Sequence, residues 1–121
     1  METIVTGTTS CDPTRRTPWG TILFGEEAGS GPSGGHMYEL INPLETTGVT
    51  LDRAAGTFSG GVGAQNLVTR TALGRVSFEG LAVYDSGVVY FGWRLARSTA
   101  CTWAPRTTAR VPNGVSGAGR C

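Results

Sequence analysis

One thiol and two adjacent carboxylates near the N-terminus are the side chains of this sequence best suited to chemistry. Cys11 precedes Glu26 by 15 residues, and Glu27 follows directly. A thiolate suits iron or zinc, whereas carboxylates suit calcium, magnesium or ferric iron. The spacing therefore permits a metal site, and the alternative is a buried apolar cysteine beside an ordinary solvated pair of acids.

A short strand is expected to position the two carboxylates. The segment Thr21–Phe24 is rich in β-branched and aromatic residues, and Glu26 and Glu27 leave its end. Because successive side chains of a strand point to opposite sides, one carboxylate can face a central site while the other faces a neighbour.

Glycine and proline divide the chain into short pieces. The longest stretch without either before residue 93 is Ala64–Leu73, which is shorter than an average helix of about 11–12 residues. Asp85-Ser86-Gly87 predicts a tight hairpin between two of the β-rich runs. The runs are Thr3–Val5, Thr21–Phe24, His36–Ile41, Val76–Phe78, Leu81–Tyr84 and Val88–Phe91. We therefore expect an all-β fold, either a sandwich or a propeller-type meander.

Two glycine-rich patterns resemble catalytic or nucleotide-binding motifs but lack the required context. Residues 29–34 fit G-x-G-x-x-G, yet Pro32 interrupts the loop and a strand-like run follows instead of a helix. Residues 31–35 fit G-x-S-x-G, but a nucleophile elbow needs a later acid and then a histidine. The single histidine, His36, lies too early for that role and is expected at a strand edge.

Charge is distributed unevenly along the chain. Residues 1–92 hold five arginines against nine acidic residues, a net charge of −4, whereas residues 93–121 hold five arginines and no acid. Five dispersed arginines do not make the dense basic patch of a nucleic-acid-binding arm. We therefore expect no nucleic-acid partner and interpret residues 93–121 as a solvated or disordered tail, in which Trp93–Ala104 could form a marginal helix.

No apolar run is long enough for a membrane segment. The longest has four residues, whereas a membrane span needs about 20 and a signal peptide an apolar core of about 7–15. As written, the chain is expected in the cytoplasm with no membrane partner. Cys11, Cys101 and Cys121 are odd in number and far apart, so a disulfide framework is not expected.

Three blocks of the sequence resemble the PhoX-type alkaline phosphatase family. The first block is T-P-W-G-T at residues 17–21, followed by Gly25-Glu26-Glu27. Residues 72–80 resemble the family's L-G-R-F-x-H-E element, with Phe78 in place of the usual histidine. Residues 36–43 resemble its Y-E-x-x-P strand, and the likeness covers roughly residues 3–92.

The resemblance implies a β-propeller with iron and calcium ions near its axis, and hydrolysis of phosphate esters, usually outside the cytoplasm. It assigns Cys11 to iron, Glu26 or Glu27 to calcium or a bridging position, and Glu79 to a further metal. Such metals would hold the phosphate oxygens and neutralise charge in the transition state.

The resemblance ends at Gly92, where the family continues with acidic residues and this chain continues with Trp93-Arg94. We therefore expect about two propeller blades in residues 1–92, and a tail over 93–121 that is disordered or read out of frame. The predicted function is a fragment of a metal-dependent phosphatase, inactive by itself, that could self-associate through open sheet edges. The alternative is a non-catalytic β-rich module that binds a partner or carbohydrate through exposed aromatic residues. These aromatic residues are Trp19, Tyr38, Tyr84, Tyr90 and Trp93.

Overall fold

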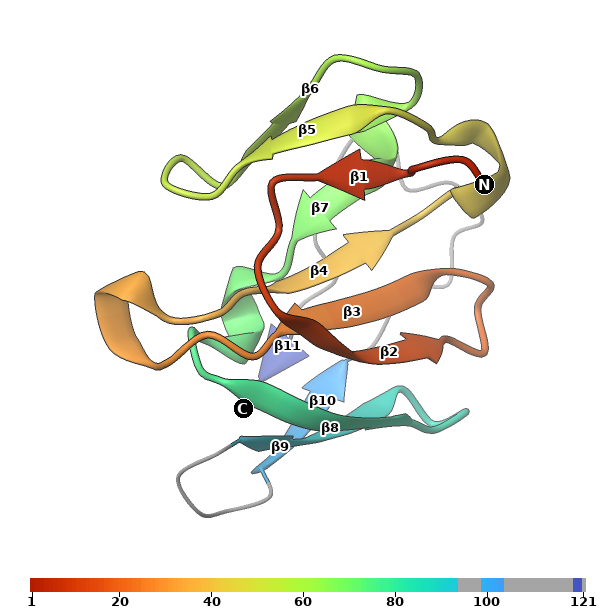
Figure 1. The fold of residues 1–121 in the computed structure, drawn as a ribbon. Helices are drawn as coiled ribbons and strands as arrows, with labels where there is room; N and C mark the ends of the chain where they lie inside the picture. Colours follow the sequence, from red (N-terminus) through yellow and green to blue (C-terminus); the bar gives the residue numbers. More distant parts are fainter. Residues whose placement is uncertain (94–98, 104–118, 121) are drawn as a thin grey trace.

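Short β-strands make up the chain in a computed structural model that describes residues 1–93, 99–103 and 119–120 (Figure 1). No α-helix occurs within these ranges. The strands are β1 (Val5–Thr6), β2 (Cys11–Arg16), β3 (Ile22–Glu26), β4 (Met37–Leu40), β5 (Val49–Asp52), β6 (Thr57–Ser59), β7 (Leu67–Thr69), β8 (Phe78–Val83), β9 (Val88–Trp93), β10 (Thr99–Trp103) and β11 (Gly119–Arg120). Single 3-10 turns are η1 (Gly31–Ser33), η2 (Pro43–Glu45), η3 (Ala64–Asn66) and η4 (Thr71–Leu73). The all-β prediction is confirmed.

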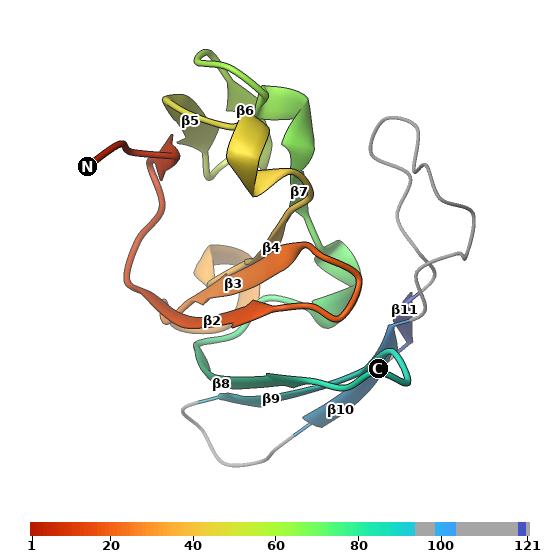
Figure 2. The same cartoon turned by 90° about the vertical axis from the view of Figure 1, so that its right-hand side faces the viewer.

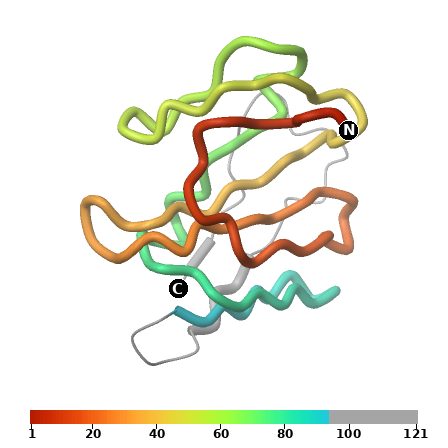
Figure 3. The backbone as a smooth tube through the Cα atoms, viewed as in Figure 1, coloured from red at the N-terminus to blue at the C-terminus, as the bar shows by residue number. Residues whose placement is uncertain are grey.

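The strands form three small sheets that lie one above another (Figures 1 and 2). The upper sheet has the order β1-β5-β6, the middle sheet β2-β3-β4-β7 and the lower sheet β11-β10-β9-β8. Pairing is antiparallel except between β1 and β5. After β1 the chain descends from the upper to the middle sheet (Figure 3). No described strand closes a sheet into a ring, so the architecture establishes the all-β class and not the finer propeller prediction.

Two separate apolar layers hold the three sheets together. The layer between the upper and middle sheets contains Phe24, Tyr38, Leu40, Val49, Leu51 and Leu67. The layer between the middle and lower sheets contains Leu23, Met37, Leu73, Phe78, Leu81, Val89 and Phe91. The middle sheet contributes to both layers because successive residues of its strands point to opposite faces, as Leu23 and Phe24 do. Burial of these side chains is the main force that stacks the sheets.

A glycine allows the middle and lower sheets to approach closely. A Cβ atom on Gly25 of β3 would lie 2.9 Å from the Cβ atom of Phe78 in β8, closer than real side chains pack. Phe78 is fully buried above this glycine and contacts the Phe91 ring edge-on, at a centroid distance of 5.2 Å. Gly25 therefore provides the space that the Phe78 ring occupies.

The hairpin prediction is confirmed by β8 and β9. The Tyr84 N–H donates to the Val88 carbonyl at 3.0 Å, and the Gly87 N–H donates to the Tyr84 carbonyl at 2.9 Å. The strand β2 was not predicted, because its sequence Cys-Asp-Pro-Thr-Arg-Arg is polar and only Pro13 is buried. It lies at the edge of the middle sheet, where neither face requires an apolar alternation.

The C-terminal part of the chain extends the lower sheet. Residues 99–103, within the segment considered as a marginal helix, form β10, which pairs antiparallel with β9. Residues 119–120 form β11 beside β10, and the rest of the tail predicted to be disordered lies outside the described residues. The predicted boundary after residue 92 falls within β9. No described helix is long and apolar enough to cross a membrane.

Candidate functional site

Strand pairing brings two of the four predicted metal ligands together. Cys11 at the start of β2 lies directly opposite Glu26 at the end of β3. Cys11 is exposed as a residue, whereas Glu26 is fully buried. Partial burial of the sulfur, together with the negative charge of Glu26, raises the pKa of the Cys11 thiol above its usual value, despite a hydrogen bond with Thr8 that acts in the opposite direction. The environment therefore disfavours the thiolate that a metal requires.

The other two predicted ligands lie in different surroundings. Glu27 is half-buried, and its N–H donates to the Ser10 carbonyl at 2.8 Å. Glu79 is exposed on β8 of the lower sheet. Among the residues whose side chains are described, no three His, Cys, Asp or Glu residues are grouped so that they could hold a metal ion. The assignment of Cys11, Glu26, Glu27 and Glu79 to metals stays a prediction.

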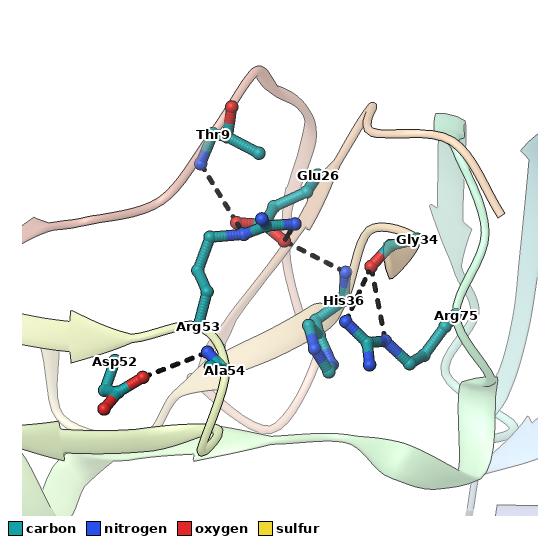
Figure 4. A network of polar contacts seen from close by, with 8 residues as sticks. All are labelled: Thr9, Glu26, Gly34, His36, Asp52, Arg53, Ala54 and Arg75. Atoms are coloured by element: carbon teal, nitrogen blue, oxygen red, sulfur yellow. Dashed lines mark hydrogen bonds and ion pairs between the residues drawn. The ribbon is translucent and has the colours of Figure 1, made fainter. Parts of the chain in front are cut away.

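The Glu26 carboxylate is surrounded by hydrogen-bond donors (Figure 4). Its Oε1 accepts from the Thr9 N–H at 3.0 Å and from Arg53 Nε at 2.9 Å. Its Oε2 accepts from the His36 N–H at 3.1 Å and from Arg53 Nη2 at 3.1 Å. These four bonds match the roughly four acceptor positions of an ionised carboxylate. Glu26 is thus a satisfied buried anion with a two-point arginine partner.

A turn of the upper sheet holds Arg53 over Glu26. Asp52, the last residue of β5, accepts hydrogen bonds from the N–H groups of Ala54 and Ala55 at 3.0 and 3.1 Å, which fixes the turn that follows (Figure 4). Burial by itself would raise the pKa of Glu26, but the hydrogen bonds from Arg53, Thr9 and His36 outweigh it and lower that pKa. The ion pair therefore links the upper sheet to the middle sheet across their interface.

His36 lies in the same polar cluster as a buried, neutral side chain. It is 8% exposed, and its Nε2 atom finds no hydrogen-bond partner among the described residues. Burial lowers the pKa of His36, and the nearby positive charge of Arg75 lowers it further. Arg75 is anchored beside it by two hydrogen bonds to the Gly34 carbonyl, at 3.3 and 3.2 Å (Figure 4). Sequence reasoning placed His36 at a strand edge, and it immediately precedes β4.

A second buried carboxylate, Glu39 of β4, lies in the block 36–43 that resembles the family's Y-E-x-x-P strand, but sequence reasoning gave it no role. Arg70 donates to its Oε2 from Nε at 2.7 Å, and the Arg70 Nη2 atom lies 2.5 Å from the same oxygen. Glu39 and Arg70 are 2% and 6% exposed, so this ion pair is more deeply buried than the pair with Arg53. The available signal was a glutamate within the β-rich run His36–Ile41, because a charge inside a buried strand needs a buried partner.

The T-P-W-G-T segment has a structural role around Glu39. Trp19 Nε1 donates to Glu39 Oε1 at 3.0 Å, and the Thr21 hydroxyl donates to the same oxygen. The Thr17 and Thr21 hydroxyls lie 2.8 Å apart, and the Thr17 N–H donates to the Thr21 carbonyl at 2.8 Å. These bonds close the turn between β2 and β3 and direct two donors at the buried carboxylate. The most specific block of the resemblance thus supports an ion pair in this chain.

Acid should destabilise the fold through His36 and Glu26. Both pKa values are lowered in the folded state, so the unfolded chain binds protons first, and stability is lost as the pH falls. We expect the free energy of unfolding to decline below about pH 6.5, the ordinary pKa of histidine, and again below about 4.5 for glutamate. Denaturant unfolding as a function of pH measures this, and His36→Gln should remove the first decline. A rise in stability between about pH 6.5 and 5 would contradict the prediction.

Comparisons of the chain with protein-family models, with curated proteins and with solved structures found no match. The resemblance to PhoX-type phosphatases therefore depends on the quoted sequence blocks alone. Fold class and the two ion pairs follow from the structure, whereas family, activity and metals do not.

Proposed function

We propose that this chain is part of a PhoX-like metal-dependent phosphatase that has no phosphatase activity of its own, and that its described residues serve as a non-catalytic, β-rich structural module. In this role Glu26, a carboxylate that the resemblance assigns to calcium or to a bridging position, has become structural. Glu26 stabilises the interface between the upper and middle sheets instead of holding a metal ion.

The observation that carries this proposal is the environment of Glu26. Both of its oxygens already accept two hydrogen bonds each, including a two-point contact with Arg53. A metal ion at this carboxylate would have to displace the guanidinium group and lie beside its positive charge. Since the carboxylate is fully buried, exchanging one cation for another would also require the local structure to open.

The stacking of the sheets supports an origin in a propeller. Small, mainly antiparallel sheets packed face to face are what neighbouring propeller blades would provide. The T-P-W-G-T block supports the same origin through its sequence resemblance alone, and in this chain its Trp19 and Thr21 donate to Glu39. The phosphate-ester substrate and the calcium and iron cofactors belong, in this proposal, to the complete family members.

Phosphatase activity and metal binding by the full chain can be measured together. We expect no hydrolysis of an aryl phosphate with calcium and ferrous iron under reducing conditions, and no change in the melting temperature on adding either metal. If the metal is present at about 100 times the dissociation constant of its site, binding raises the free energy of unfolding by about 2.7 kcal/mol. A thermal melt detects a change of this size readily. Robust turnover, or metal-dependent stabilisation, that disappears in Cys11→Ser would overturn the proposal. Cys11 is exposed, so this variant should fold.

A further inference from the structure

Arg75 is a half-buried arginine whose positive charge has no carboxylate partner. Its Nε and Nη2 atoms donate to the Gly34 carbonyl at 3.3 and 3.2 Å, and it forms no ion pair with any residue that the structure describes. The carbonyl is neutral, so it fixes the guanidinium group without balancing its charge. The Nη1 atom, and the end of the group that Nη1 shares with Nη2, remain available to a further acceptor.

The glycine-rich loop before β4 fixes the backbone on both sides of this guanidinium group. The Gly31 N–H donates to the Arg75 carbonyl at 3.2 Å. The Val76 N–H donates to the Gly35 carbonyl at 3.1 Å. Only glycine fits at position 35, since a Cβ atom there would lie 2.2 Å from the Glu26 carbonyl oxygen. Arg75 is therefore positioned before any ligand arrives, which reduces the entropy cost of binding.

His36 provides a second polar group beside Arg75 (Figure 4). It is 8% exposed, and its buried Nε2 atom makes no hydrogen bond with a described residue. The charge of Arg75 helps to lower the pKa of His36, as expected for neighbouring groups. Tyr38, which sequence reasoning counted among the exposed aromatic residues, is instead fully buried and packs against the imidazole at a centroid distance of 5.7 Å. A neutral imidazole can carry its proton on Nε2 and donate it to a ligand, which removes the cost of an unpaired buried atom.

The charges around His36 favour an anion that carries a single negative charge. Glu26 and Arg53 balance each other through their two-point contact, so the charge of Arg75 is the one left over among these groups. One negative charge on a ligand would complete the balance, whereas a second would be repelled by the buried Glu26 anion. Two parallel N–H groups of a guanidinium match the two coplanar oxygens of a carboxylate.

We propose that Arg75 and His36 form a binding site for a small monocarboxylate, whose oxygens accept from Nη1 and Nη2 of Arg75 and from Nε2 of His36. The inference goes beyond the structural role of Glu26 and does not depend on the phosphatase origin. The ligand also differs from the phosphate esters that the resemblance implies, because a phosphate group carries up to two charges near neutral pH.

Acetate is the probe, and the single histidine of the chain reports on the site. The imidazole signals of the full chain are followed by NMR at a constant pH of about 7.5, while sodium acetate replaces sodium chloride at constant ionic strength. We expect a shift that saturates with a dissociation constant of about 1–10 mM. Inorganic phosphate should bind at least about tenfold more weakly, because its second charge faces Glu26.

Two replacements of Arg75 test its part in the site. Arg75→Gln removes the charge, and Arg75→Lys keeps the charge but lacks the paired donors, so both should raise the dissociation constant for acetate at least about tenfold. The amide spectrum of each variant verifies its fold. Arg15→Gln is the matched control, because Arg15 is exposed and also donates to a backbone carbonyl, that of Thr14, and it should bind acetate like the unmodified chain.

Each other result would overturn the proposal. The titration of the unmodified chain decides by itself if both Arg75 variants unfold, since a shift that does not saturate below about 100 mM acetate means that no such site exists. A saturable shift that persists in folded Arg75→Gln, or that Arg15→Gln weakens equally, places acetate elsewhere. Tighter binding of phosphate than of acetate excludes the monocarboxylate assignment. The proposed lack of phosphatase activity is tested separately by the aryl phosphate assay, so either proposal can fail without the other.

Discussion

Replacing Arg70 by alanine lowers the free energy of unfolding by about 3–5 kcal/mol, because Glu39 is then left as a buried anion without its cation. Both side chains are almost completely excluded from solvent, and two arginine nitrogens contact one carboxylate oxygen. A domain of this kind has roughly 5–15 kcal/mol of stability in total. The variant is therefore expected to be largely unfolded or to melt far earlier, as denaturant unfolding followed by circular dichroism will report.

A double replacement separates the charge effect from the loss of packing. Glu39→Leu combined with Arg70→Met removes both charges and keeps similar volumes, and it should cost less than Arg70→Ala alone. Arg15→Ala is the matched control for removing an arginine, since Arg15 is exposed on β2 and the change should stay within about 0.5 kcal/mol. If Arg70→Ala proves as harmless as Arg15→Ala, the ion pair does not stabilise the fold as described.

Replacing Phe78 by alanine costs about 3–5 kcal/mol and separates the lower sheet from the middle sheet. The ring is fully buried, contacts Phe91 and fills the space above Gly25. Because β3 and β8 are brought together over this ring, the cavity would open at the interface itself. Thermal and denaturant unfolding measure the loss, and exchange of backbone amide hydrogens should show β8 and β9 becoming less protected than β3 and β4.

The control for Phe78→Ala is Leu44→Ala, a truncation of an apolar side chain that is 96% exposed. It should change stability by no more than about 0.5 kcal/mol. A small loss in Phe78→Ala, with unchanged protection of β8 and β9, would contradict the packing role assigned to this ring. Phe78 occupies the position where the resemblance expects a histidine. A large loss of stability in Phe78→Ala would therefore show that the residue at this position serves core packing in this chain.

Local sequence patterns were sufficient for the class of fold and for its clearest hairpin. Frequent glycine and proline excluded long helices, and the β-rich runs at 81–84 and 88–91 on either side of Asp85-Ser86-Gly87 became β8 and β9. The edge strand β2 escaped prediction because it is polar and mostly exposed. A strand of that kind forms through hydrogen bonds to β3, which hydrophobic periodicity does not reveal.

For the candidate site, the difference between what the sequence predicted and what the structure shows is larger than for the fold. The sequence drew attention to Glu26, but its chemical type alone left a metal ligand and a solvated acid as the alternatives. The structure gives a third state, in which Glu26 is buried and paired with Arg53, 27 positions later in the chain. Glu39 and Arg70, 31 positions apart, were given no role, because Glu39 appeared only within the block 36–43 and neither residue has metal or catalytic spacing.

The sequence by itself determined that this protein is built from short strands and which residue types are present near one another along the chain. Only the tertiary structure decided what those residues do. Sheet stacking and strand register bring each buried carboxylate to a distant arginine, and the surrounding exclusion of water makes that partner obligatory. Burial and long-range pairing are properties of the whole packed chain, so no local spacing of Cys11, Glu26 and Glu27 could reveal them.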